Sequence, residues 1–501
     1  MKRRAKPRLK GRPAGIFCPV SALPSRFGIG DFGPGAYRWL DWLAAAGQQY
    51  WQVLPLTIVD AAGSPYMSSS SRAGNWLLLS PERLVDAGWL EPADVGGRPE
   101  PAATIGYRRA ARIKRRILGR AYRRFLRTAD RRSLQRWQAF VARQQSWLEP
   151  FALYAALKDH WRHQPWWRWP AAYQTWSSTR RQVPPSVVRG QRFHTFLQWL
   201  FDEQWTALRS AAHDRGIRII GDLPFFTPLD SVEVWQDRSL FQLTRTGRPQ
   251  AVAGVPPDPF NPQGQRWGMP VYRWSKHRRH RFQWWQERLQ AALGRYDLVR
   301  FDHFHGYVST WHIPARHLRA RRGHWVATPG REILQTLRQS SWRKRILVED
   351  LGHYSPRAEQ LRRGFHLPGT RVLIFGWSGL RDNIHSLPHI GPDVFCYTST
   401  HDTNTVNGWW QQEARWYERR QVARLFLATS QLHWRFITAV YRSGARVAMV
   451  PVQDVLGLGS EGRLNKPGTK RRNWRWRLRP GLLTSRLARR LRHLTEANYD
   501  T

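Results

Sequence analysis

The chain has 501 residues, and its 81 Lys and Arg against 35 Asp and Glu give a formal net charge of +46. An apolar fraction of 41% is typical of a globular protein and excludes global disorder, while a mean hydropathy of −0.60 without any long apolar run excludes membrane-spanning helices. The two cysteines, Cys18 and Cys396, are too few for a disulfide framework, and no apolar segment follows the basic N-terminus, so we expect a reducing cytoplasm and no membrane insertion.

Eight short runs rich in β-branched and aromatic residues predict the strands of one parallel sheet. They cover residues 15–19, 50–56, 217–223, 298–304, 346–351, 371–375, 394–402 and 447–454. Helical periodicity separates most of these runs, for example over residues 36–46 and 357–363. Eight alternating strand and helix units favour the α/β class and a closed (β/α)8 TIM barrel over an open sheet.

The first gap that is too long for a simple crossover covers residues 57–214, and its mainly helical pattern predicts an inserted subdomain. The barrel then comprises residues 15–56 and 215–501, and residues 1–14 form a basic tail. Within the insertion, residues 108–136 hold 13 basic residues and predict one basic amphipathic helix with its apolar row packed on the barrel. A membrane or nucleic-acid surface is the alternative partner of this helix. The apolar row consists of Ile113, Ile117, Ala121 and Phe125.

The second long gap predicts an insertion over residues 236–275 that carries an active-site loop. Its centre, residues 253–270, contains so many Pro and Gly residues that no helix can form there. A long loop at the mouth of a barrel is usually functional.

Carboxylates follow several of the predicted strands. They are Asp222, Asp302, Glu349 with Asp350, Asp402 and Asp454. Each of them alone could be a salt-bridge partner or a helix cap. Because the carboxyl ends of barrel strands meet at the active face, the set predicts a site that needs carboxylates. Retaining glycoside cleavage fits, since it uses one carboxylate as the nucleophile and a second carboxyl, with a raised pKa, as acid and then base.

Aromatic rings can stack on the apolar faces of sugars, and Phe260, Trp267, Tyr272 and Trp274 in or near the second insertion fit such a groove. Core packing is the alternative for each ring. Other chemistry has little support, because the chain has no P-loop, no H-E-x-x-H pair and no G-x-S-x-G elbow, although a Ser–His–Asp triad is not excluded. Asp302 with His303 and His305 is a conceivable metal corner, but this spacing is common by chance.

The charge of +46 has two interpretations. A polyanion partner would bind a basic surface. Alternatively, the composition has drifted, since Arg, Ala, Gly, Pro and Trp are abundant, Lys is scarce and the bases are spread along the whole chain. The sequence favours drift and leaves polyanion binding open. In either case we expect the positive field to lower the pKa values of the site carboxylates and to shift the activity optimum to acid pH.

The chain resembles glycoside hydrolase family 77 of the α-amylase clan, the 4-α-glucanotransferases called amylomaltases or disproportionating enzymes. The resemblance covers nearly the whole chain and implies a (β/α)8 barrel with helical insertions, no separate C-terminal β domain and no metal or organic cofactor. The matching motifs occur in the family's order: GIGD (28–31), YWQVLPL (50–56), GSPY (63–66), GDLP (221–224), DSVEVW (230–235), AGVPPD (253–258), GQRWG (264–268), RFDHF (300–304), VEDLG (348–352), LPG (367–369), YTSTHD (397–402), PVQDVLG (451–457), NKPG (465–468) and NWRWR (473–477).

By resemblance, Asp302 is the nucleophile that forms a covalent glycosyl-enzyme, and Glu349 is the acid and then the base. Asp402 would hold hydroxyls of the distorted sugar, and Arg300 would keep Asp302 ionised and oriented. The other implied substrate-binding residues are His401, Asp222, Tyr66, Ser64, Tyr50, Trp267, Phe260 and Asp454.

The implied activity is retaining transfer of an α-1,4-glucan segment from a donor to the 4-OH of glucose or a maltooligosaccharide. A mainly hydrolytic α-glucan enzyme and a polyanion-binding protein on a retired scaffold are the alternatives. The sequence departs from the family's motifs at several positions that would touch subsites rather than the three carboxylates. They are Met67, Pro259 with Phe260, Met269, His305 with Tyr307, and Thr403 with Asn404.

Overall fold

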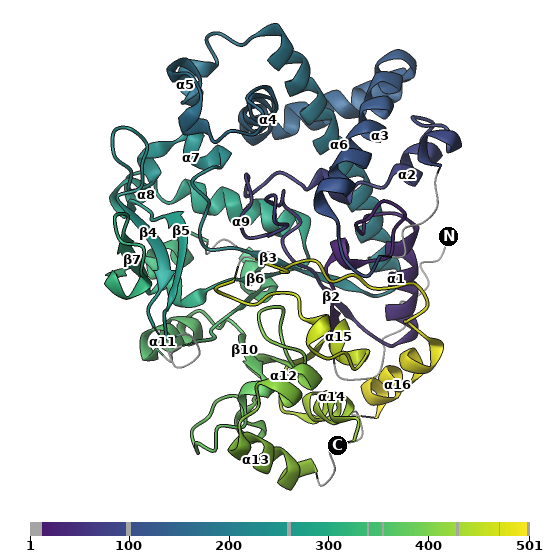
Figure 1. Cartoon of the computed structure of the whole chain (residues 1–501), viewed down its shortest axis with the longest axis vertical. Coiled ribbons are helices and arrows are strands. Elements are labelled where there is room, and N and C mark those ends of the chain that lie inside the picture. Colours follow the sequence, from purple (N-terminus) through teal and green to yellow (C-terminus); the bar gives the residue numbers. More distant parts are fainter. Residues whose placement is uncertain are drawn as a thin grey trace.

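Eight parallel strands form a barrel at the centre of the molecule (Figure 1). The computed structural model describes residues 13–96, 102–257, 262–337, 340–352, 355–426, 430–469 and 471–497. The strands are β1 (Ala14–Phe17), β2 (Tyr50–Gln52), β3 (Arg218–Leu223), β6 (Leu298–Phe301), β9 (Ile346–Val348), β10 (Gly369–Val372), β11 (Val394–Tyr397) and β12 (Val447–Pro451). They pair in the order β10-β11-β12-β1-β2-β3-β6-β9. A hydrogen bond of 2.9 Å from Val348 N to Pro368 O joins β9 to the chain that enters β10, so the ring closes.

Every predicted strand run overlaps one of these barrel strands, so the α/β class and the (β/α)8 TIM barrel are confirmed. The runs are continuously apolar because both faces of the strands are covered, as in β12, where every residue is buried. After β12 the described chain forms the helices α15 (Val452–Val455) and α16 (Ser485–Glu496) and no further named strand.

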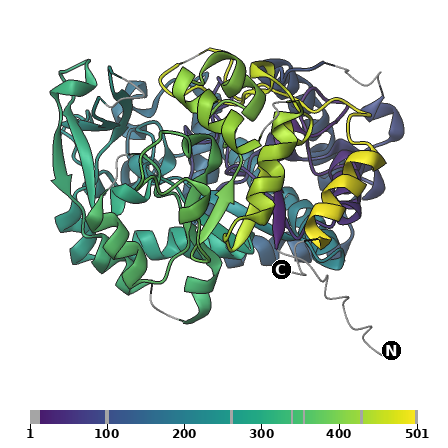
Figure 2. The same cartoon turned by 90° about the horizontal axis from the view of Figure 1, so that it is seen from below.

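Helices surround the barrel, as expected for parallel strands joined by crossovers. They are α1 (Pro34–Ala45), α9 (Gln283–Arg295), α10 (Gly330–Thr336), α11 (Pro356–Gly364), α12 (Val406–Gln412), α13 (Trp416–Phe426) and α14 (Leu432–Arg442). The last helix, α16, lies beside α1 (Figure 2) and is tied to it by bonds from the Arg492 side chain to the Ala44 and Ala45 carbonyls, both 2.8 Å. The two ends of the described chain therefore meet on the same side of the barrel.

The helices of the first insertion lie above the barrel in Figure 1. They are α2 (Pro81–Asp86), α3 (Tyr107–Thr128), α4 (Arg131–His160), α5 (Trp176–Thr179) and α6 (Pro185–Asp214). The prediction of one helix over residues 108–136 is wrong. α3 ends at Thr128, and Asp130 caps the start of a separate helix, α4, because its carboxylate accepts a bond of 2.7 Å from Ser133 N. The buried ring of Phe125 packs on Phe196 and Trp199 of α6 at centroid distances of 4.9 and 5.3 Å, so the apolar row contacts α6 instead of the barrel strands.

The second insertion contains strands as well as helices. Its strands β4 (Ala251–Val255) and β5 (Gln265–Pro270) join β7 (Ser309–Pro314) and β8 (His324–Ala327) in an antiparallel sheet in the order β5-β4-β7-β8. β7 and β8 come from the segment between β6 and β9, outside the predicted insertion. The helices on either side of β4 and β5 in the sequence are α7 (Val232–Gln236) and α8 (Trp274–Arg279). The prediction of a plain loop over residues 253–270 is therefore wrong, although that segment contains no named helix where it is described. Gly264, with a φ of +63°, precedes β5, a backbone conformation that glycine adopts at no steric cost. None of the described helices is long and apolar enough to cross a membrane.

Candidate active site

A cleft of about 2530 Å³ lies at the carboxyl ends of the barrel strands. Asp302, Glu349 and Asp402 all line it, although they follow three different strands, β6, β9 and β11. An ordinary small-molecule pocket measures roughly 300–1,000 Å³. The cleft is therefore large enough for a chain of several sugar units.

Arg300 connects the carboxylates at the floor of the cleft. Its Nη1 lies 2.8 Å from Asp222 Oδ2 and 2.8 Å from Asp302 Oδ1, and its Nη2 lies 3.9 Å from Glu349 Oε2. The pairing register of β3 and β6 explains the contact with Asp222, because Arg300 on β6 is directly opposite Asp222 on β3. One guanidinium therefore orients two carboxylates directly and neighbours a third.

Two backbone amides hold Glu349. His303 N donates to Oε2 at 2.8 Å, and Leu351 N donates to Oε1 at 3.1 Å. His303 has a φ of +50°, a left-handed conformation that is uncommon outside glycine. Since His303 directly follows Asp302, this conformation couples the position of the Glu349 carboxyl to that of Asp302. The role of the His303 amide in holding Glu349 was not predicted from the sequence. The positive φ of His303, a non-glycine residue, is the feature that indicates this role, and it is visible only in the folded chain.

The pKa values of Asp302 and Glu349 are both raised. Burial is the main cause, and the positive charge of Arg300 opposes the rise in both groups. Arg300 is closer to Asp302 than to Glu349, so it favours the ionised form of Asp302 more strongly, and a proton shared by the pair resides on Glu349. The expectation that the field of +46 lowers the pKa values of these carboxylates is therefore wrong. Desolvation and neighbouring charges outweigh distant surface charges, which salt screens beyond about 10 Å.

Tyr66 and His401 form a second hydrogen-bonded group beside Asp222. The Tyr66 hydroxyl donates to Asp222 Oδ2 at 2.8 Å and lies 2.8 Å from His401 Nε2. Because the hydroxyl has a single proton, His401 must donate its Nε2–H to the Tyr66 oxygen. Burial lowers the pKa of His401, so the ring is neutral at neutral pH. Its Nε2 is also 3.4 Å from Asp402 Oδ2, which links this group to the third carboxylate.

Asp402 differs from the other two carboxylates because 43% of its side chain is exposed. Its Oδ1 accepts a bond of 2.6 Å from Asn465 Nδ2. Asn465 N in turn donates to His401 O at 3.0 Å. Asn465 belongs to the NKPG motif at 465–468, but sequence reasoning gave it no role. It fixes the rotamer of Asp402 at the edge of the cleft.

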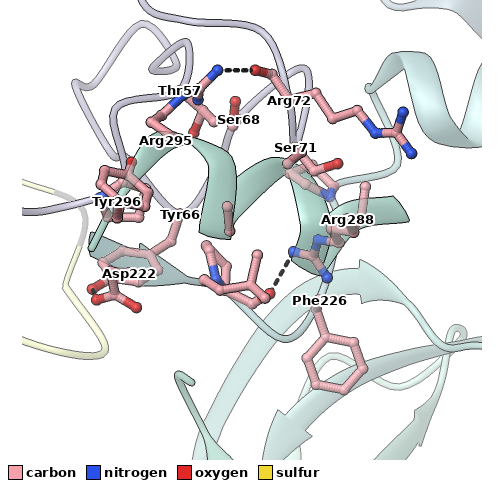
Figure 3. A pocket seen from close by; sticks show the side chains of 17 residues that line it. Thr57, Tyr66, Ser68, Ser71, Arg72, Asp222, Phe226, Arg288, Arg295 and Tyr296 are labelled. Atoms are coloured by element: carbon pink, nitrogen blue, oxygen red, sulfur yellow. Dashed lines mark hydrogen bonds between the residues drawn. The ribbon is translucent and has the colours of Figure 1, made fainter. Parts of the chain in front are cut away.

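The wall behind Asp222 encloses a small cavity of about 30 Å³ (Figure 3). Arg295 Nη2 donates to Arg72 O at 2.6 Å, and Arg288 Nη1 donates to Phe225 O at 2.9 Å. The hydroxyl of Tyr296 accepts a bond of 3.1 Å from Leu56 N. These bonds fix the loops after β2 and β3 to α9, and so hold Asp222 and Tyr66 in place from behind.

The other predicted binding residues fall into two groups. Ser64 and Trp267 line the cleft, and the Trp267 ring lies 4.9 Å from the His303 ring. Tyr50 does not line it, because it starts β2 and its buried hydroxyl bonds to Arg218 at the opposite end of the barrel. Asp454 does not line it either, since its buried carboxylate accepts bonds from Thr398, Ser399 and the amide of Val406.

Phe260 lies outside the described residues. Tyr272 and Trp274 are buried in an aromatic cluster and do not reach the groove, so for these two rings core packing is the correct interpretation. Several positions at which the sequence departs from the family's motifs line the cleft, namely Met67, Met269, His305 and Thr403. Asn404 is instead buried and donates to Glu413 and Ser460.

Among the described residues, no three His, Cys, Asp or Glu side chains are grouped so that they could hold a metal ion. His303 and His305 therefore form no metal corner with Asp302 in this part of the chain. Burial lowers the pKa of His303 to about 3, so its ring is a neutral packing partner of Trp267.

Comparisons with known proteins agree over almost the whole chain. The family model described as 4-alpha-glucanotransferase matches residues 18–484. The chain is 40% identical to the 4-alpha-glucanotransferase of Thermus thermophilus, covering 97% of this chain and 98% of that protein. It is 35% identical to the chloroplastic/amyloplastic 4-alpha-glucanotransferase of Solanum tuberosum, covering 93% and 82%. The amylomaltase of Streptococcus agalactiae, solved in complex with acarbose, superposes with a TM-score of 0.92 at 30% identity and covers 98% of this chain and 99% of its own.

Proposed function

This chain belongs to the 4-alpha-glucanotransferase family, glycoside hydrolase family 77, and from that premise we propose that it transfers α-1,4-glucan segments to the 4-OH of glucose or maltooligosaccharides with retention. The observation that carries the proposal is the contact of one buried guanidinium, Arg300, with both Asp302 and Glu349 in a cleft of glucan size. A retaining enzyme needs an ionised carboxylate and a protonated carboxyl close together, and unequal contact with one cation supplies that difference.

In the first step, Asp302 attacks the anomeric carbon and its carboxylate oxygen forms a bond to that carbon. The bond to the leaving oxygen breaks, and Glu349 donates its proton to that oxygen. In the second step, the 4-OH of the acceptor attacks the same carbon while Glu349 accepts its proton and Asp302 leaves. Two displacements at one carbon restore its configuration, and the proton returns to Glu349 in each cycle.

Asp402 lines the cleft and binds hydroxyls of the sugar that reacts with Asp302. We assign the same role to Asp222 and His401, which are buried behind the cleft lining and are joined to it through the Tyr66 hydroxyl. Carboxylates close to the ring also stabilise the positive charge that develops in an oxocarbenium-like transition state. Asp402, held by Asn465 and partly exposed, has an oxygen available for a hydroxyl. Ser64, Tyr66 and Trp267 border the same space. This acid–base chemistry transfers no electrons and uses no metal or organic cofactor.

Transfer rather than hydrolysis requires that an acceptor sugar occupies the site before water attacks the glycosyl-enzyme. The hairpin of β4 and β5 borders the cleft and carries Trp267, and we assign it the covering role. The mainly hydrolytic alternative and the polyanion-binding alternative are both less favoured, because the family match spans residues 18–484 and the carboxylates are grouped around Arg300. Binding of anionic polymers in addition to catalysis, and a cytoplasmic location with two buried free cysteines, are the further parts of the proposal.

The test is incubation with maltotriose, with the products resolved by length. We expect glucose together with a ladder of oligomers longer than maltotriose, and no products from the Asp302→Asn variant, which keeps glucan binding. Glucose and maltose without longer products would indicate a hydrolase. Near-full activity of Asp302→Asn would show that the nucleophile is another residue.

A further inference from the structure

Two tryptophans of the described chain are strongly exposed, and they differ in position. Trp416 on α13 is 74% exposed and does not line the cleft, whereas Trp325 on β8 is 49% exposed and does line it. Most other described tryptophans are buried or half-buried. Leaving a large apolar ring in water is unfavourable unless a ligand covers it, so an exposed ring at the edge of a binding cleft indicates a contact surface.

Trp325 is held in a fixed orientation. It lies directly opposite Trp311 in the β7–β8 pair, with ring centroids 5.3 Å apart and an interplanar angle of 69°. The next pair on the same face of the sheet is Ser309 and Ala327, and both line the cleft together with Trp325. Small neighbours leave the face of this ring accessible. The outer strand of the sheet thus presents the rigid ring of Trp325 to the cleft, which limits the entropy lost when a ligand binds.

A chain of contacts connects this sheet to the acid–base side of the site. Glu349 is bonded to His303 N, the His303 ring contacts Trp267, and Trp267 lies on β5, the first strand of the sheet. Trp325 lies on β8, the last strand. Since Glu349 protonates the leaving oxygen in the proposed function, the leaving or incoming glucan extends from the cleavage point over this sheet.

We propose that Trp325 forms an outer glucan-binding subsite on the leaving-group and acceptor side, where its ring stacks on the apolar face of a sugar several units from the cleaved bond. The inference rests on the proposed function and adds a preference for long chains. β8 is three strand spacings from β5, about 14 Å. The one or two units of maltotriose on this side of the bond are too short for that span, whereas amylose can cover it.

The variants are Trp325→Ala, Trp325→Phe and the matched control Trp416→Ala, assayed with maltotriose and with amylose. We expect Trp325→Ala to raise KM for amylose about three- to ten-fold, the value of one aromatic contact, with a much smaller effect on maltotriose. Trp325→Phe should recover most of the loss. Trp416→Ala should behave like the wild type with both substrates, and equal thermal midpoints would show that all variants are folded.

Amylose binding can also be measured without turnover, from the slower migration of the protein in native gels that contain amylose. We expect Trp325→Ala to migrate faster than the wild type in the amylose gel, and both proteins to migrate equally in a gel without glucan. The same change of KM for both substrates, or equal retardation of all variants, would overturn the subsite. A wild type that makes no oligomer ladder but still shows retardation dependent on Trp325 would overturn the proposed function and leave the subsite standing.

Discussion

Arginine has different environments at the floor of the cleft and on the outer helix α3. Arg300 is buried, with 7% of its side chain exposed, and contacts three carboxylates. On α3, Arg115, Arg120 and Arg124 pair with acids at side-chain exposures of 48%, 44% and 35%. An exposed pair contributes about 0–1 kcal/mol, whereas removal of one partner from a buried pair costs about 3–5 kcal/mol. The comparison teaches that the net charge of +46 is mostly a surface property and that one buried cation determines the chemistry.

The largest expected effect comes from Arg300. Arg300→Ala leaves Asp222 and Asp302 buried without their cation, so we expect a loss of about 3–5 kcal/mol in the free energy of unfolding and a fall in kcat of about 10²–10³-fold. Urea unfolding and the maltotriose assay measure the two losses. The matched control Arg120→Ala should lose less than about 1 kcal/mol and keep its activity. Equal losses in both variants would remove the distinction between the two regions.

The pH profile of kcat/KM is expected to show the next largest effect. The rising limb reports ionisation of Asp302, and the falling limb reports loss of the proton from Glu349. Burial raises the pKa of both groups, so both limbs move to higher pH, and activity persists above the ordinary glutamate range before Glu349 deprotonates. A falling limb at about pH 4–5, the range of an exposed glutamate, would show that surface charge and not burial controls the site.

The smallest effect on catalysis is expected on α3. Arg116, Arg123 and Arg127 are exposed there, and the triple exchange to Gln should change kcat/KM by less than about two-fold, because salt screens charges at this distance. The variant should elute from heparin at lower salt than the wild type, since it has lost three cations. A large loss of glucan transfer would mean that the basic surface takes part in catalysis.

The barrel and the positions of its carboxylates along the chain follow from local sequence patterns. Strands that are buried on both faces are continuous apolar runs, so β3 and β6 can be recognised locally, and Asp222 and Asp302 follow as strand-end residues. The motifs also identified Glu349 and Asp402, which line the same cleft. These strands and motifs can be recognised in the sequence because each depends only on residues that are adjacent in the chain.

Which strand-end residues meet in the cleft depends on how the whole chain folds. Asp402 and Asp454 both follow barrel strands, yet Asp402 is partly exposed in the cleft while Asp454 is buried with its bonds satisfied. Tyr50 and Tyr66 both belong to quoted motifs, but only Tyr66 reaches Asp222. Strand register and loop direction decide such differences, and neither is encoded by the residue type.

The antiparallel sheet and the raised pKa of Glu349 could not be predicted from the sequence either, because both arise from contacts between distant parts of the chain. β4 and β7 pair across more than fifty residues, and a segment rich in Pro and Gly gives no alternating pattern that would reveal β5. The pKa of Glu349 rises because the folded chain removes water from it, an effect that overrides a net charge of +46. Local sequence specifies which groups are present, whereas burial and distance, which only the folded chain creates, specify how strongly they interact.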